Sequence, residues 1–461
     1  MCYLAPKESD GSEEQTAMDN ISPKEGRLKV LVVAAAVHPR MGSEPGMGWN
    51  WLKALSEHHD LWVISGEYKD NRQAIHEEFS KEPRLAERIH FQFLPWFWPR
   101  KNPLARSLCN ALPPLYYIWY KRWHKDAFVA AQRLASEIPF DLAHQLNMIG
   151  YREPGYLWRL GLPFVWGPVG GTNNAPITLS FSFGLQGAIV ALGRTLLNHV
   201  QLLGSPRVAA ALAHTDCLVN AITEGREKFL RHHGKDSVVI SEVGTEEELL
   251  GHVAVPKAAS PAVKLAWSGL HVNRKCLPLA LRALAPHKGK SWSLDVLGTG
   301  PLTEDWKAEA LRLGLGPHIT WHGWMERQKA VAVMSGADVL LCSSLSEASS
   351  TVILEALSLA MPIVTLDHCG MADIVDDSCG IKVRIGYPAE TIGRFSQAIG
   401  RFLAEPELLP SLSSGALARA RQLRWPNLAK RMCNVYLRAI HLAHAAKAQR
   451  TTQDQTERET G

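Results

Sequence analysis

The chain has 461 residues, which is more than one ordinary hydrophobic core supports, so we expect two domains. A hydrophobic content of 46% and a charged content of 21% are typical of a globular protein, and a net charge of +5 gives no electrostatic reason to expect a nucleic-acid partner. None of the eight cysteines forms a Cys-x-x-Cys pair, which disfavours a zinc site and suits a reducing compartment.

The beginning of the chain and its most apolar stretch both argue against a membrane-spanning protein. Residues 1–26 are polar and lack the apolar core of a signal peptide, so we expect a disordered lead there. Residues 176–192 are interrupted by serine, glutamine and glycine, which predicts a helix that is buried or lies on a surface. We therefore expect a cytoplasmic protein.

Residues 27–250 alternate short apolar strands with helices, the pattern of a doubly wound parallel sheet. We expect strands at residues 28–34, 60–64, 89–94, 141–144, 164–166 and 216–220. This pattern predicts an N-terminal Rossmann-like domain.

Three glycines, Gly42, Gly46 and Gly48, follow the first strand directly. Their spacing is neither the G-x-G-x-x-G of dinucleotide-binding proteins nor a Walker loop. One interpretation is a tight turn from strand to helix. The other is a glycine loop at a cleft, whose backbone approaches a ligand closely.

A segment rich in aromatic and basic residues extends from Pro95 to Trp123. It is either an excursion that lines the core and has an exposed basic rim, or a membrane-surface patch. In the second interpretation the aromatic rings lie at the lipid interface and the lysines and arginines contact anionic lipid.

His144 ends a predicted strand. A single histidine in such a position is usually packed and hydrogen-bonded in the core. Its candidacy as a catalytic residue comes from a resemblance to a known family, which is described below.

Residues 246–262 resemble a linker, with Pro256 and Pro261, and a second alternation of strands and helices follows. We expect strands at residues 264–267, 292–297, 319–322, 337–342 and 362–366. The second Rossmann-like domain then covers residues 251–424, a C-terminal helix covers 425–446, and a disordered tail covers 447–461. Two such domains face each other across a cleft, where ligands commonly bind.

Arg274 and Lys275 follow the first strand of the second domain. A pair of basic residues on a loop is commonly just solvated. At the carboxyl end of a parallel strand, however, these side chains are placed to bind a phosphate group.

The most informative segment is the loop and helix between residues 346 and 357. Glu347 lies on a loop at the carboxyl end of a buried strand, and Glu355 lies about two turns into the next helix. The helix begins near Ser349, Ser350 and Thr351, and either serine could cap it. Its amino end can hold a diphosphate, with one acid on each side to bind a polyhydroxyl ring.

This segment, with Met361–Val364 after it, resembles the signature of the family 4 retaining glycosyltransferases, which have the GT-B fold. The sequence departs from the family pattern at three positions: Ala348 replaces a glycine, Leu270 replaces an arginine, and Leu146 replaces the second histidine of an H-x-H motif.

The resemblance implies a role for each candidate residue. Glu347 holds hydroxyls of the transferred sugar, and Glu355 holds the ribose. Lys275 binds the diphosphate, with Arg274 able to supply the charge that Leu270 lacks. His144 lies near the reacting sugar. Gly323, Trp324 and Met325 border the base of the nucleotide. Gly42, Gly46 and Gly48 form a glycine loop that lies across the cleft from the donor.

The function that follows is transfer of a hexose, with retention, from a nucleotide diphosphate sugar to a saccharide or lipid-linked saccharide acceptor. The first domain binds the acceptor and the second binds the donor. No Asp-x-Asp triplet is present, so we expect no metal, and the nucleotide sugar is a co-substrate rather than a cofactor. Polysaccharide or glycolipid biosynthesis at the inner face of the membrane suits this reaction. The alternatives are a non-catalytic binder of sugar nucleotides or polysaccharides and a nucleotide-sugar epimerase.

Overall fold

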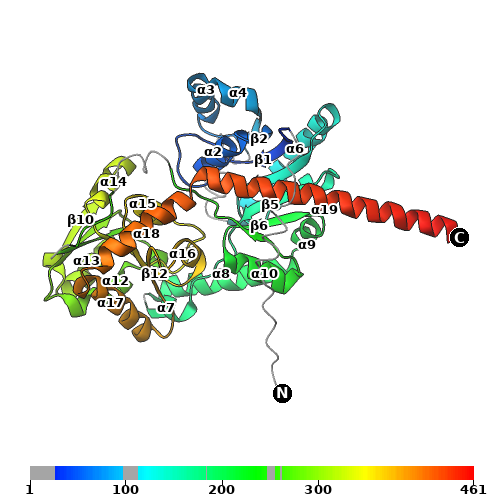
Figure 1. Ribbon diagram of the computed structural model, residues 1–461. Helices are drawn as coiled ribbons and strands as arrows, with labels where there is room; N and C mark the ends of the chain where they lie inside the picture. Colours follow the sequence, from blue (N-terminus) through cyan, green and yellow to red (C-terminus); the bar gives the residue numbers. More distant parts are fainter. Residues whose placement is uncertain (1–25, 97–112, 183, 247–254, 260–261, 461) are drawn as a thin grey trace, which may run out of the picture.

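The computed structural model describes residues 26–96, 113–182, 184–246, 255–259 and 262–460, which form two domains, each built around one parallel sheet (Figure 1). Helices cover the sheets in both domains. The predicted α/β fold class is confirmed. The lead over residues 1–25 and the segment over residues 97–112 lie outside the described residues.

The first sheet has seven strands in the order β3-β2-β1-β4-β5-β6-β7, all parallel. They are β1 (Lys29–Ala34), β2 (Asp60–Glu67), β3 (Ile89–Pro95), β4 (Leu142–Asn147), β5 (Phe164–Val169), β6 (Cys217–Asn220) and β7 (Val238–Val239). The helices of this domain are α2 (Ser43–Ser56), α3 (Asn71–Lys81), α4 (Pro83–Arg88), α6 (Pro113–Glu137), η1 (Leu157–Arg159), α7 (Ile177–Ser182), α8 (Leu185–Gly204), α9 (Pro206–Ala213) and α10 (Thr223–His233). Strands β4 and β5 are buried along their whole length, as a parallel sheet covered on both faces requires.

The second sheet has six parallel strands in the order β10-β9-β8-β11-β12-β13. They are β8 (Val263–Ser268), β9 (Trp292–Leu297), β10 (Ile319–Gly323), β11 (Val339–Cys342), β12 (Ile363–Leu366) and β13 (Gly380–Val383). The helices are η2 (Asn273–Lys275), α12 (Leu277–Leu284), η3 (Ala285–His287), α13 (Thr303–Arg312), η4 (Gly316–His318), α14 (Arg327–Ser335), α15 (Thr351–Ser358), α16 (Cys369–Ile374), α17 (Pro388–Ala404) and α18 (Leu408–Gln422). Apolar residues from both faces of this sheet form one continuous core.

The strand order reverses direction once in each sheet, between β1 and β4 in the first and between β8 and β11 in the second. At such a switch point the loops that leave neighbouring strands diverge to opposite faces and open a crevice at the carboxyl ends. Each domain therefore has one such crevice, and the loops that form it follow β1, β4, β8 and β11.

The two domains are joined where the chain crosses between them. Residues 242–246 lead out of the first domain, and residues 423–425 lead back. The crossings are tied together because Thr245 N donates to Leu423 O at 2.9 Å and the Thr245 hydroxyl donates to Ala420 O at 2.7 Å. Beside them, the Trp51 and Trp425 rings meet edge to face at 5.5 Å.

The last helix, α19 (Trp425–Thr460), packs on the first domain and then extends beyond it (Figure 1). Tyr436 and Met432 bury its first half in the core of that domain. The expected end at residue 446 and the disordered tail over 447–461 are not what the structure has, because the helix continues to Thr460. Residues 447–460 contain no glycine or proline and many strong helix formers, so nothing in them ends the helix.

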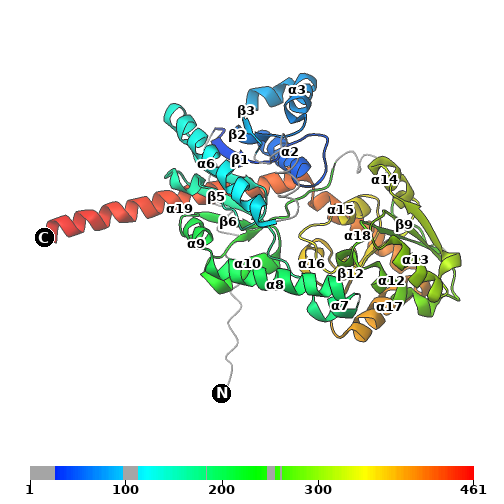
Figure 2. The ribbon, with the colours of Figure 1, turned by 180° about the vertical axis from the view of Figure 1, so that it is seen from behind.

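The helices α7 and α8 run from the first domain to the second (Figure 2). Leu179 on α7 is buried in the core of the second domain, although its neighbours in sequence belong to the first. Among the residues that the structure describes, no helix is long and apolar enough to cross a membrane.

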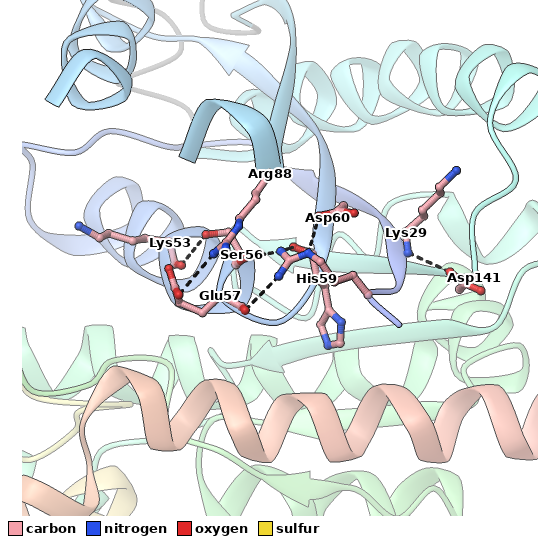
Figure 3. Close-up of polar contacts among 9 residues, drawn as sticks. Lys29, Lys53, Ser56, Glu57, His59, Asp60, Arg88 and Asp141 are labelled. Carbon is pink, nitrogen blue, oxygen red and sulfur yellow. Dashed lines mark hydrogen bonds and ion pairs between the residues drawn. The ribbon is translucent and has the colours of Figure 1, made fainter. Parts of the chain in front are cut away.

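Polar contacts hold the amino ends of the strands at the edge of the first sheet opposite the crevice (Figure 3). Arg27 donates to the Asp60 carboxylate at 2.7 Å and to the Ser56 carbonyl at 2.5 Å, and Lys29 N donates to Asp141 at 2.8 Å. His59 points toward α19, where burial lowers its pKa to about 4. The contacts at the amino ends of these strands are structural, and ligand binding is expected at the carboxyl ends.

Candidate active site

The two crevices meet in one cleft between the domains. A cavity of about 430 Å³ is lined by loops that follow strands of both switch points. Its lining includes Glu44, Tyr116, Tyr117, Tyr120, Met148, Ile149, Gly150 and Arg194 from the first domain and Arg274, Ser346, Glu347 and Ala348 from the second. A neighbouring cavity of about 320 Å³ reaches the start of α15.

Glu347 lies at the centre of this cleft. Its carboxylate accepts from Arg274 Nη1 at 2.6 Å and lies 2.7 Å from Lys275 Nζ. Its side chain is 10% exposed, whereas that of Arg274 is 44% exposed and that of Lys275 is 11% exposed. Glu347 and the two neighbouring cations, which are separated by more than 70 positions in the sequence, are thus brought together in the cleft. A diphosphate that binds here can replace the carboxylate as the ion-pair partner of the two cations.

The loops that carry these residues are held against each other by backbone contacts. Leu345 N donates to Arg274 O at 2.7 Å, which ties the loop after β11 to η2. Gly298, at the end of β9, has a φ of +108°, and a Cβ there would lie 2.0 Å from Gly269 O. Only glycine permits this approach, so the loop after β8 has a fixed position.

The amino end of α15 faces the smaller cavity through Ser349, Ser350 and Thr351. Ser350 is the N-cap residue, but its side chain makes no capping hydrogen bond. The Ser349 hydroxyl donates instead to Glu242, in the crossing from the first domain. The expected side-chain cap is therefore absent from this helix start, whose positive end can attract an anion.

Glu355 lies further along α15, outside both cavities. It accepts from Arg327 Nε at 2.7 Å, and Arg327 Nη1 donates to Glu246 at 2.8 Å. Burial raises the pKa of Glu355, and Arg327 opposes that rise. Arg327, at the start of α14, was missed by the sequence analysis because a single arginine carries no motif.

The predicted base-binding residues follow β10. Gly323 ends this strand with a φ of +71°, and its carbonyl accepts from Gly298 N at 2.8 Å. Trp324 is 72% exposed, so its ring is open to stacking, whereas Met325 packs against the core. Trp324 stands three residues before Arg327, the ion-pair partner of Glu355.

Two carboxylates on the first-domain side of the cleft were also missed. Glu44, in the first turn of α2, accepts from Ile149 N at 3.3 Å. Glu242 is buried, and one of its two carboxylate oxygens has no hydrogen-bond partner. Burial, and then the neighbouring Glu242 charge, raise the pKa of Glu44 to about 8, and burial raises that of Glu242 to about 7.

The glycine-loop prediction needs correction, because Gly46 and Gly48 lie inside α2 and only Gly42 precedes it, as its N-cap. A Cβ on Gly48 would lie 2.5 Å from the Asn147 side chain, and one on Gly46 would lie 1.9 Å from Met41 O. The two glycines allow α2 to pack closely on its neighbours. The residues of this segment that line the cavities are Ser43, Glu44 and Met47.

The catalytic prediction for His144 is also corrected. Its ring is fully buried, with Nδ1 2.7 Å from the Tyr436 hydroxyl and Nε2 2.6 Å from Gly167 O. Burial lowers its pKa to about 4. A neutral ring whose nitrogens are both occupied by α19 and β5 cannot reach a sugar in the cleft, so His144 joins α19 to the sheet.

The described part of the aromatic and basic segment fits both earlier interpretations. Tyr116, Tyr117 and Tyr120 line the larger cavity, whereas Ile118 and Trp119 are exposed. The remainder of that segment falls among residues 97–112 and lies outside the described residues.

One cluster has the composition of a metal site. Ligand atoms of Glu224, His368 and Cys369 lie within 4.8 Å of one another at the contact between α10 and α16. Lys228 Nζ, however, lies 2.5 Å from Glu224, and burial raises the pKa of the Cys369 thiol. The cluster is explained as a set of polar contacts across the domain interface.

Comparison with known proteins agrees with this architecture. Residues 262–405 match the family described as glycosyl transferases group 1. D-inositol 3-phosphate glycosyltransferase of Streptomyces griseus is 28% identical over 131 residues, which are 28% of this chain and 27% of that protein. Lipopolysaccharide glucosyltransferase WaaG of Escherichia coli is 33% identical over 87 residues, 19% of this chain and 23% of WaaG. The alignments thus span about a quarter of each of these two curated relatives.

Solved structures match over most of the chain at low identity. Lipopolysaccharide outer core galactosyltransferase WaaB superposes with a TM-score of 0.55 and 13% identity, over 91% of this chain and all of WaaB. HepE of Anabaena in complex with UDP-glucose gives 0.51 and 13%, over 89% of this chain and 99% of HepE. The chain therefore has the GT-B fold, and its residues 262–405 match the group 1 glycosyltransferase family.

Proposed function

We propose that the protein is a retaining glycosyltransferase that moves a sugar from a nucleotide diphosphate sugar to an acceptor hydroxyl, in polysaccharide or glycolipid biosynthesis. The observation that carries this proposal is the placement of Glu347 between Arg274 and Lys275 where the two crevices meet. This is where a donor bound by the second domain meets an acceptor bound by the first.

The chemistry that this arrangement supports is a same-face displacement. The bond between the anomeric carbon and the diphosphate oxygen breaks as the acceptor oxygen bonds to the same carbon. The acceptor's proton passes to the leaving phosphate, so no protein nucleophile is needed. Arg274, Lys275 and the amino end of α15 stabilise the negative charge on the diphosphate, and Glu347 orients the sugar ring.

The acceptor in this proposal is a saccharide or a lipid-linked saccharide, used at the cytoplasmic face of a membrane. Two observations support it. The tyrosines of α6 line the cleft and suit stacking on a sugar, and WaaB and WaaG, both named for lipopolysaccharide, are among the similar proteins.

A second candidate function is non-catalytic binding of a sugar nucleotide. The observation that favours it is Leu270, which occupies the usual arginine position and is 58% exposed, so it supplies no charge. Arg274 lies four residues further on and reaches Glu347, which favours the enzyme.

Donor hydrolysis separates the two functions. A thermal-shift screen with uridine, guanosine and adenosine diphosphate sugars first identifies the donor as the one that raises the melting temperature. We expect slow release of free nucleoside diphosphate from that donor, because water in the cleft competes with the acceptor. Binding without any release would identify a binder.

We also expect activity to survive a chelator. The two cations on η2 supply the positive charge that a metal supplies in other transferases, so EDTA should leave the rate of donor hydrolysis within about twofold of that without it. The control is restoration with Mg²⁺ or Mn²⁺. A loss on chelation that either metal reverses would contradict the metal-independent mechanism.

A further inference from the structure

One side of α8 is an uninterrupted apolar surface. Six large apolar side chains repeat at intervals of three or four residues and are between 45% and 66% exposed. They are Leu185, Ile189, Leu192, Leu196, Val200 and Leu203, here called the α8 stripe. The spacing places them along one face of the helix. An apolar surface of this length, open to solvent, indicates an interaction site.

The helix that carries the α8 stripe has no acidic side chain. Residues 176–204 contain no aspartate or glutamate, and Arg194 on α8 is exposed. At the carboxyl end of α8, His199 lies 5.4 Å from His232 on α10, and Arg231 beside it is also exposed. A row of exposed apolar side chains without acids beside it, and with Arg231 at its carboxyl end, matches an anionic lipid surface, where the apolar chains enter the interface and the cation contacts headgroups.

A second side of α8 faces the active site. With Asn273 and Arg274 it lines a cavity of about 480 Å³, to which it contributes Val190 and Arg194. Gly187 lies so close to the second domain that a Cβ there would be 2.5 Å from the Asn273 side chain. Arg194 also lines the cavity of about 430 Å³ that contains Glu347. Only the thickness of α8 separates the apolar stripe from the transfer site.

We propose that the α8 stripe docks in the interfacial layer of an anionic lipid bilayer, with α8 (Figure 2) parallel to the surface and the cavities that Arg194 lines on the other side of the helix. A lipid-linked acceptor then brings its phosphate past Arg194 toward Glu347; this last statement rests on the proposed function. The competing occupant is a second copy of the chain. The positions that flank the stripe lack the opposite charges that specify helix pairing, which favours lipid.

The test is flotation of the full chain with phosphatidylcholine vesicles that contain about 30% phosphatidylglycerol. We expect the protein to float with these vesicles and added salt to weaken the binding. The double variant Ile189→Ser/Leu196→Ser should bind at least about tenfold more weakly. The matched control, Val255→Ser/Leu311→Ser, replaces two apolar residues that are 69% and 70% exposed elsewhere, and should bind as the wild type does.

The other outcomes are equally decisive. Absence of flotation, or equal flotation of the stripe variant, would overturn the docking proposal. So would a wild-type dimer that the stripe variant converts to monomers, because the stripe would then be covered by a second copy. Nucleotide-sugar binding by thermal shift is measured in parallel. If it persists when flotation fails, only the docking is wrong; if vesicles bind but no nucleotide sugar does, the proposed function is wrong.

Discussion

Replacement of Glu347 by glutamine is expected to lower turnover about 100-fold, which corresponds to roughly 2.7 kcal/mol of transition-state stabilisation. Glutamine keeps the shape of the side chain but removes the charge that holds Arg274 at 2.6 Å and Lys275 at 2.7 Å. Both cations lose their fixed position, and the sugar loses a charged hydrogen-bond acceptor. Donor affinity should change little, because the cations stay available to the diphosphate.

The same experiment on Glu355 should give the opposite result. Glu355→Gln is expected to weaken nucleotide binding about tenfold, because the role proposed for this acid is to hold the ribose. Turnover at saturating donor should be spared, because Glu355 pairs with Arg327 away from the transfer cavity. Titration of both variants with donor, followed by initial rates, separates the two effects.

A matched control is available in the same domain. Glu309 accepts from Arg282 at 2.6 Å and is 13% exposed, so Glu309→Gln also breaks a half-buried ion pair, on α13 and outside the cavities described above. Its turnover should equal that of the wild type. If Glu347→Gln turns over like this control, the transfer site is not at Glu347.

The fold could be predicted because its signal is local. A parallel strand covered by helices is a short run of apolar residues, and such runs occur at β1, β8 and β11 with helices between them. The placement of Glu347, Arg274 and Lys275 followed from the same rule, since all three come directly after strands that end at a switch point.

The rest of the site depends on contacts that no sequence spacing records. Glu44 and Glu242 are isolated acids, and they become neighbours only where the crossing from the first domain passes the start of α2. His144 stands at a strand end as a catalytic histidine would, yet its ring faces Tyr436, 292 positions later. Gly46 and Gly48 were predicted to lie in a loop because glycine is common in turns, but they lie in a helix. Glycine is also used where a helix packs closely on its neighbours, and the sequence does not distinguish the two uses.

Deprotonation of Glu242 is expected to destabilise the protein as the pH rises. Its pKa is about 7 in the folded protein and about 4.5 in the unfolded chain, so the folded state binds the proton more tightly. The resulting stability is fully present below about pH 4.5 and is lost between about pH 4.5 and 7, by an amount on the order of 3 kcal/mol. Because Glu44 titrates beside it, the loss extends toward pH 8.

Glutamine is a close mimic of the protonated acid. Glu242→Gln should therefore match the wild type at pH 5 and exceed its stability at pH 8, as measured by denaturant unfolding at both values. Ser349→Ala should move the wild-type transition to higher pH, because the Ser349 hydrogen bond lowers the pKa of Glu242. A Glu242→Gln protein that is less stable than the wild type at both pH values would contradict this account.

The protonation state of Glu242 should also affect the affinity for the donor. Glu242 faces Ser349 at the amino end of α15 and lines the cavity that Arg274 and Lys275 also line. A neutral Glu242 leaves that cavity positive, whereas a charged one opposes a diphosphate there. Donor affinity should thus fall as the pH rises through about 7 to 8 in the wild type and should fall less in Glu242→Gln, in which only Glu44 still titrates in that cavity. A pH-independent wild-type affinity would mean that the diphosphate binds away from the crossing between the domains.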